Sequence, residues 1–180
     1  IITLSILCVA SLAGEPLTAD STPVARWDFG AEEETQLTPH GNVLRDQAGP
    51  RPPEFPDFSN SNTAVRLDGK SAYFSVVDPG ADSDFDFAND DAITIEAWIK
   101  VDDIRDGQPM YVIGKGRTNN KGFAANNQNY ALRLRGQGGE GCVSFLFFSR
   151  PGKDKQGDWH RWTSDIGVLP GDGWSHVAVT

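Results

Sequence analysis

The chain has 180 residues, of which 38% are hydrophobic and 23% charged, an ordinary composition for a soluble globular domain, so neither a fibrous nor a disordered class is indicated. Its 25 acidic and 16 basic residues give a formal net charge of −9 without a visible basic stripe, which argues against nucleic acid as a partner. Of its two cysteines, Cys8 lies in the apolar first stretch, which leaves Cys142 alone in the rest of the chain, so we expect the domain to rely on its hydrophobic core rather than on disulfides.

The first stretch, residues 1–13, is apolar and predicts the hydrophobic part of a signal peptide. Ser11-Leu12-Ala13 before Gly14 places small residues where signal peptidase cleaves, and the run is too short for a bilayer, which takes about 20 apolar residues. Neither an initiating Met nor a basic segment precedes it, so we expect the true start to lie upstream. Residues 14–23 then form a leader, and the mature protein is secreted, periplasmic or extracellular. The alternative is a buried N-terminal strand.

Short segments rich in β-branched and aromatic residues follow, separated by Gly, Pro, Asn and Asp, which is the pattern of strands and turns. They are 24–29, 64–68, 72–77, 92–101, 110–115, 129–135, 142–149 and 173–180. No long stretch has a 3.6-residue period, so a helical core is excluded. The spacing predicts an all-β fold, an antiparallel two-sheet sandwich or jelly roll.

Alternation is clearest in residues 92–101, where one face is apolar and the other carries Thr94, Glu96, Trp98 and Lys100. Residues 129–135 repeat the pattern, with Tyr130, Leu132 and Leu134 opposite Ala131, Arg133 and Arg135. Residues 142–149 are apolar on both faces and are expected at the centre of a sheet, with Cys142 as a small buried hydrophobe.

Three long stretches between these strands, 30–63, 116–128 and 150–172, are predicted to be irregular. The first contains Arg51-Pro52-Pro53-Glu54-Phe55-Pro56, which fits neither a helix nor an inner strand. Loops of this length are more often functional than decorative, with disorder as the alternative. The last segment, 173–180, stops in mid-strand, so we expect the fold to continue beyond Thr180.

Six motifs follow one another along the chain: LDGKSAYFSV (67–76), DFDF (84–87), AITIEAWIK (92–100), VIGKG (112–116), NYALRL (129–134) and GWSHVAVT (173–180). In this order and spacing they resemble the laminin-G-like, concanavalin A-type jelly-roll superfamily. The resemblance covers residues 24–180 and implies a two-sheet jelly roll, incomplete at its C-terminus. A non-catalytic module that binds a glycan or an extracellular protein is the function it implies.

A narrower resemblance rests on ARWDF (25–29), GNV (41–43) and DQAGPRPPEFP (46–56). These segments are similar to jelly-roll domains of large secreted bacterial proteins, in which a module of the Planctomycete cytochrome C family follows. That resemblance implies a haem-carrying module downstream, to which this domain would be an accessory. The chain has no Cys-x-x-Cys-His, so no residue here is assigned to haem.

Residues 78–91 carry six carboxylates and no cation, between two predicted strands. Alternate Asp side chains in a turn can bind Ca²⁺ at about 2.3–2.6 Å, and Asp82, Asp84 and Asp86 are the candidate ligands. The spacing is not that of an EF-hand. The alternative is an acidic turn whose Asp side chains bond their own backbone.

Tryptophan supplies the candidate ligand contacts. Trp98 lies on the polar face of its strand, and Trp159 and Trp162 fall in a predicted loop near His160. An exposed indole can stack on a sugar ring while amides such as those of Asn126 and Asn127 bond its hydroxyls, and Asn119 and Asn120 are further partners of this kind. The alternative is packing, the role expected for Trp27 and Trp174 in the core.

Catalysis is poorly supported. His40, His160 and His176 lack the spacings of a zinc site. Glucanases of related fold use paired glutamates about 5–5.5 Å apart when they retain configuration, whereas Glu96 has no carboxylate partner along its strand. We therefore expect a binding module first, an accessory domain of a haem protein second and a glycoside hydrolase third.

Overall fold

The computed structural model describes residues 2–11, 23–29, 37–80, 83–87, 91–116, 130–149 and 158–180. Over these ranges the chain forms strands and no helix. The strands are β1 (Ile2–Ser11), β2 (Ala25–Trp27), β3 (Thr38–His40), β4 (Leu44–Ala48), β5 (Thr63–Leu67), β6 (Tyr73–Ser75), β7 (Ala92–Val101), β8 (Pro109–Lys115), β9 (Tyr130–Gln137), β10 (Glu140–Ser149), β11 (Asp158–Val168) and β12 (Ser175–Val179).

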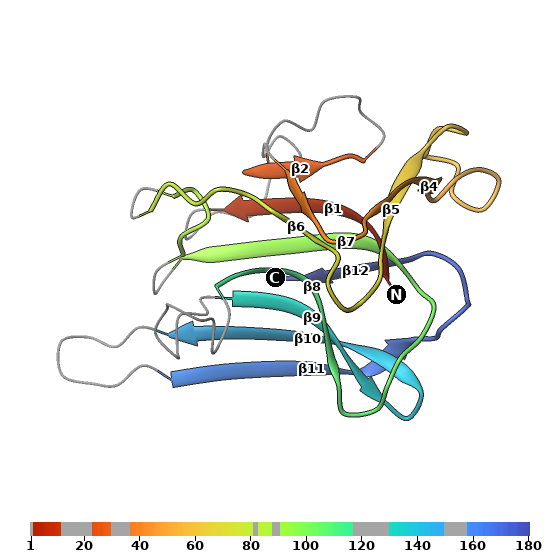
Figure 1. Ribbon diagram of the computed structural model, residues 1–180. Coiled ribbons are helices and arrows are strands. Elements are labelled where there is room, and N and C mark those ends of the chain that lie inside the picture. The colour runs from red at the N-terminus through yellow and green to blue at the C-terminus, as the bar shows by residue number, and fades with distance from the viewer. Residues whose placement is uncertain are drawn as a thin grey trace.

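The strands form two main antiparallel sheets, as the sequence predicted. The first has six strands in the order β12-β7-β1-β5-β4, with β2 paired to β1, and the second has four in the order β11-β10-β9-β8. A separate two-stranded ribbon joins β3 to β6. In Figure 1 the six-stranded sheet occupies the upper part of the view and the four-stranded sheet the lower part.

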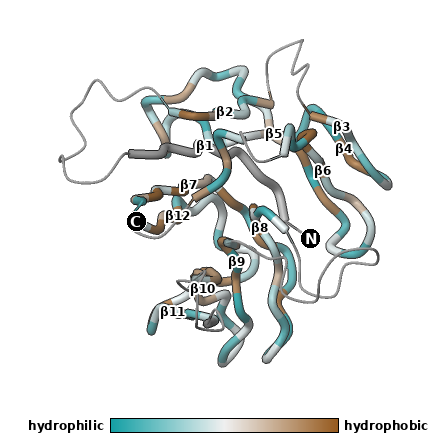
Figure 2. Tube along the Cα trace, turned by 90° about the vertical axis from the view of Figure 1, so that its left-hand side faces the viewer, coloured by the Kyte–Doolittle hydropathy of each residue, from teal (hydrophilic) through white to brown (hydrophobic). Residues whose placement is uncertain are grey.

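A single hydrophobic core lies between the two sheets. On β7, Ile95, Ala97, Ile99 and Val101 are at most 1% exposed, which confirms the predicted apolar face. They pack with the buried side chains of β9 and β12, namely Tyr130, Leu132, Leu134, Val177 and Val179. Figure 2 shows hydrophobic and hydrophilic residues alternating along these strands. Alternation alone therefore assigns the inner face of β7 and of β9.

The apolar segment 142–149 has the central position predicted for it, because β10 lies between β9 and β11. Cys142 is a free, buried cysteine, as expected. Burial raises the pKa of its thiol, and the negative charges of Glu140 and Asp165 add to that effect. A protonated, enclosed thiol is a poor nucleophile, so Cys142 serves packing.

Three strands lie where the sequence predicted irregular structure. β3 and β4 fall within residues 30–63, and β11 falls within residues 150–172. β4 and β11 are edge strands of their sheets, and β3 pairs with β6 alone. An edge strand needs no continuous apolar face, so its mixed sequence gives a weak strand signal. The run 51–56 forms turns, as expected.

Trp27 lies in the core at 7% exposure, as predicted, but Trp174 does not. Trp174 precedes the first residue of β12 and is only partly buried, because it lies outside the paired part of the strand. The prediction of a core position for Trp174 is therefore wrong.

β1 takes up the position between β7 and β5. All ten of its residues are in register with β7, and Ile2, Thr3 and Leu4 also face β5. In the structure residues 2–11 thus form a strand within the sheet, which is the alternative to a signal peptide. Residues removed by a signal peptidase cannot also serve the mature sheet, so the two roles exclude each other. Residues 12–22, which include most of the predicted leader, lie outside the described residues.

Candidate functional site

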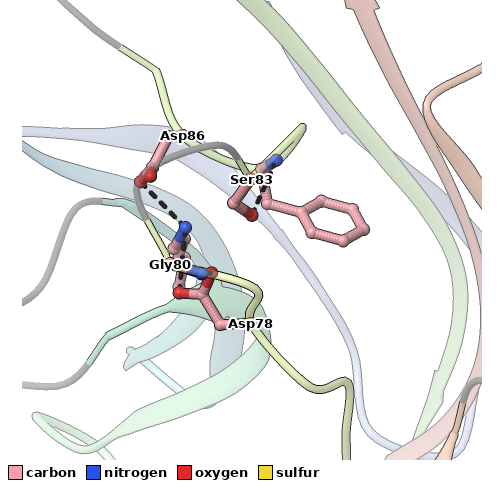
Figure 3. A network of polar contacts seen from close by, with 6 residues as sticks. Asp78, Gly80, Ser83 and Asp86 are labelled. Carbon is pink, nitrogen blue, oxygen red and sulfur yellow. Dashed lines mark hydrogen bonds and ion pairs between the residues drawn. The ribbon is translucent and has the colours of Figure 1, made fainter.

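Two carboxylates of the acidic segment after β6 pair with a lysine from β8, and Figure 3 shows Asp78 and Asp86 with Gly80 and Ser83 near them. Lys115 Nζ lies 3.0 Å from Asp78 Oδ2 and 2.8 Å from Asp86 Oδ1. Asp78 Oδ1 also accepts the backbone N–H of Gly80 at 3.0 Å, which is the Asx-turn of the alternative interpretation. That bond and, after it, the Lys115 ammonium group lower the pKa of the Asp78 carboxyl. The sequence missed Lys115 because it is 29 residues from Asp86.

The candidate calcium ligands are only partly placed. Asp82 lies outside the described residues, Asp84 is exposed in a turn, and Asp86 is bound to Lys115. Among the described residues, no group of three or more His, Cys, Asp and Glu is arranged to hold a metal ion. Calcium at Asp82, Asp84 and Asp86 therefore stays a prediction, and the ion would have to compete with Lys115 for Asp86.

Trp98 lies on the outer face of the six-stranded sheet, where the sequence placed it, but aromatic rings cover it. The rings of Phe55 and Phe58 meet it edge to face, at centroid distances of 5.0 and 5.2 Å. The centroid of the His176 ring lies 5.2 Å from that of Trp98, and His176 Nε2 lies 3.1 Å from Glu96 Oε2. Trp98 thus holds the Pro-rich segment 51–58 against the sheet, which agrees with packing rather than with an open sugar platform.

Trp159 and Trp162 lie on β11 and not in a loop, so that prediction is wrong. Trp159 is opposite Phe148 and Trp162 is opposite Phe145 in the β10–β11 register. Because successive side chains of a strand alternate, the two indoles point to opposite faces of the four-stranded sheet. They are 37% and 60% exposed, respectively. Asn126 and Asn127 lie outside the described residues.

Trp162 lies on the inner face of the four-stranded sheet, on its edge strand β11. Phe147 is exposed there and stacks on His160, with ring centroids 4.8 Å apart. His160 Nε2 lies 2.9 Å from Ser149 Oγ, which fixes the imidazole ring. This edge is aromatic and only weakly polar.

The opposite, outer face of the same sheet carries a row of polar side chains across all four strands. Tyr111, Arg133, Ser144 and Thr163 are successive partners in register from β8 to β11. Arg133 Nη2 donates to Ser144 Oγ at 3.0 Å, and Thr163 Oγ1 donates to the same oxygen at 3.4 Å. The Arg133 guanidinium lies over the Tyr111 ring, 5.8 Å from its centroid.

Arg133 is the unusual member of this row. It is 5% exposed, and among the described residues its Nε is a buried side-chain atom without a hydrogen-bond partner. Burial lowers the pKa of its guanidinium, the Tyr111 side chain opposes that shift, and the charges of Arg161 and Arg135 reinforce it. The sequence placed Arg133 on a polar face but gave no sign that the face is covered at this point.

We call this surface the basic-aromatic face and define it by the residues that share the outer side of the sheet in register: Tyr111, Arg133, Arg135, Phe148, Trp159 and Arg161. The face joins one of the two predicted β11 tryptophans to arginines that the sequence did not single out. The signal that could have found it is the Arg133–Arg135 alternation together with Arg161 beside Trp159.

Residues 68–180 match the family described as the concanavalin A-like lectin/glucanases superfamily, a match that covers more than half of the chain. No curated protein and no solved structure matches the chain. This match does not show the narrower resemblance to domains that precede Planctomycete cytochrome C modules, and that resemblance stays a prediction. The described residues contain no helix long and apolar enough to cross a membrane.

Proposed function

Because the chain belongs to the concanavalin A-like lectin/glucanases superfamily, whose laminin-G-like domains are generally non-catalytic binding modules, we propose that it is a glycan-binding module of a secreted protein. The observation that carries this proposal is the basic-aromatic face of the four-stranded sheet. It combines partly exposed rings with hydrogen-bond donors on one rigid surface, the combination on which sugar recognition rests.

Two rings of this face are partly exposed, Tyr111 at 39% and Trp159 at 37%. Sugar rings present C–H groups that pack on aromatic faces, and guanidinium N–H groups donate to sugar hydroxyls. Arg161 is exposed beside Trp159 and can supply such donors. The rigid strand backbone of β8–β11 holds these groups in place, which lowers the entropy cost of binding.

Trp159→Ala tests the proposal, with Trp162→Ala as the matched control from the opposite face of the same strand. Affinity electrophoresis and calorimetry on soluble polysaccharides should show that Trp159→Ala weakens binding about tenfold or more, as expected for an aromatic contact residue. Trp162→Ala should bind like the parent protein. Equal affinities of the parent and Trp159→Ala, with both folded by circular dichroism, would refute the proposal.

Two alternatives remain from the sequence. An accessory role beside a haem module rests on the narrower resemblance, and a Cys-x-x-Cys-His motif in the reading frame past Thr180 would support it. A glycoside hydrolase is disfavoured because the carboxylate of Glu96 pairs with the imidazole of His176 rather than with a second carboxylate. Hydrolysis of β-glucans that is lost in Glu96→Gln would reverse that ranking.

A further inference from the structure

Residues 2–11 hold a position inside the six-stranded sheet that cleavage of a signal peptide would leave empty. β1 is paired with β7 over all ten of its residues on one side, and with β5 at residues 2–4 and β2 at residues 6–8 on the other (Figure 1). The predicted cleavage after Ala13 removes this strand from the exported protein. The mature sheet then has a strand position to fill between β7 on one side and β5 and β2 on the other.

An unfilled position at this place is unfavourable because the neighbouring strands are buried. In an antiparallel ladder alternate residues bond to alternate sides, so about half of the backbone groups of β7 point to β1. Ile95, Ile99 and Val101 of β7 are fully buried, as is Val65 of β5. A buried backbone N–H or C=O without a partner costs free energy comparable to a lost hydrogen bond. Several of them together offset much of the small net stability of a domain.

The neighbouring strands are poorly placed to close the gap themselves. β5, β2 and β7 are all antiparallel to β1 and therefore parallel to one another. Closing the gap requires a relative shift of about one strand spacing, roughly 4.7–4.9 Å. β7 is held by β12 and by the core that it shares with β9, and β5 is held by β4. The position is therefore better filled by another strand.

The register defines the strand that fits. It runs antiparallel to both β7 and β5 and carries apolar residues at alternate positions, opposite the inner face of β7. Residues 2–11 have this pattern. The residues in register with the inner face of β7 are Ile2, Leu4, Ile6, Cys8 and Ala10.

No segment of residues 14–180 is available with the same pattern. The described strands from β2 to β12 already have their own positions. Of the longer segments outside the described residues, 14–22 contains a proline, 117–129 is rich in Asn, and 30–36 and 150–157 are rich in charged residues. None of these four sequences alternates between apolar and polar residues as residues 2–11 do.

We propose that the position between β7 and β5 is a strand-acceptor site, filled in the mature protein by an apolar, extended segment of the same polypeptide that follows Thr180. The inference rests on the secretion included in the proposed function, and it does not depend on glycan binding. A segment of the same polypeptide is favoured over a separate protein because a tether supplies it at an effective concentration on the order of millimolar, whereas an exported partner is dilute. In the uncleaved chain residues 2–11 occupy the site instead.

Hydrogen exchange read by mass spectrometry tests the proposal on the complete protein that the cell exports. We expect residues 1–13 to be absent and the β7 amides on the side away from β12 to exchange about a thousandfold more slowly than in an unfolded chain. A further slowly exchanging strand should lie after residue 180. Rapid exchange of those β7 amides would overturn the proposal. Protection that is lost on dilution, or that needs a second protein, would overturn the tethered occupant.

An exported chain that stops at Thr180 tests the site with a defined probe. We expect this truncated form to lose the protection of β7, and a synthetic peptide of residues 1–13 to restore it. The same peptide with Ile6→Pro is the matched control and should not restore protection, because proline cannot donate a hydrogen bond within a central strand. Equal protection of the truncated and complete proteins without peptide contradicts the proposal, as does restoration by the control peptide. If the truncated form precipitates, the exchange pattern of the complete protein decides.

The outcomes distinguish this inference from the proposed function. An exported protein that retains Ile2 refutes strand replacement, because β1 then stays in the sheet, and it leaves glycan binding standing. A protein that is never exported contradicts the secretion on which the inference rests. Loss of glycan binding in Trp159→Ala, with β7 protected in the mature protein, supports both.

Discussion

Replacing Trp98 by Ala tests whether this residue packs the Pro-rich segment or contacts a ligand. Each of its edge-to-face pairs, with Phe55 and with Phe58, contributes about 0.5–1.5 kcal/mol beyond area burial, so the two together contribute about 1–3 kcal/mol. Removal of a buried Trp side chain costs about 3–5 kcal/mol in a core, and Trp98 is only partly buried. We therefore expect Trp98→Ala to lower the free energy of unfolding by about 3 kcal/mol.

Urea unfolding followed by circular dichroism measures this loss, and limited proteolysis should show earlier cleavage within residues 51–58. Trp162→Ala is the control, because its side chain is 60% exposed and should change the free energy by less than about 0.5 kcal/mol. A double-mutant cycle with Phe58→Leu should give a coupling energy of about 0.5–1.5 kcal/mol. If Trp98→Ala unfolds like the parent but binds glycan more weakly, the packing argument is wrong and Trp98 is a ligand contact.

Three further predictions concern the loops and the N-terminus. Backbone N–H groups of residues 70–72 hold the pKa of the Asp68 carboxyl well below its ordinary value, so the stability that this carboxylate contributes is present above about pH 4 and is lost as the pH falls. Asp68→Asn should therefore lower the melting temperature at pH 7 and much less near pH 2. Equal losses of melting temperature at both pH values would contradict this role of the Asp68 charge. Millimolar calcium should raise the melting temperature, and more so in Lys115→Met, where Asp86 is released from its ammonium partner. If calcium shifts the melting temperature of neither protein, the predicted calcium site at Asp82, Asp84 and Asp86 is wrong. N-terminal sequencing of exported protein should begin at Gly14, and a chain that retains Ile2 would instead use β1 as its strand between β5 and β7.

Elements with one buried face were predictable from the sequence. The alternation of residues 92–101 and 129–135 assigned the inner faces of β7 and β9, because burial of one side imposes a period of two. β11 was missed for the opposite reason. It is an edge strand with Trp159 on one face and Trp162 on the other, so its sequence Asp158–Val168 shows no apolar face.

The candidate sites were harder to predict because long-range contacts decide them. Trp98 was placed on the correct face of its strand, yet Phe55 and Phe58, some forty residues earlier, determine that it is covered. In the same way the acidic segment 78–91 carries no cation of its own and receives Lys115 from β8. Local spacing identifies which side chains can do chemistry, but the pairing of distant strands decides which of them remain open.

The two sides of the four-stranded sheet differ in a way that packing alone does not require. At neighbouring positions of β9, Leu132 and Leu134 fill the core, and Ala131 is buried on the outer side without a charge. Arg133 stands between them at 5% exposure, and its Nε has no hydrogen-bond partner among the described residues. An apolar residue there would avoid the desolvation of a guanidinium and its repulsion from Arg135 and Arg161. Its hydrogen bond to Ser144 Oγ and its position over the Tyr111 ring offset part of that cost and tie β9 to β10 and β8 on the outer face.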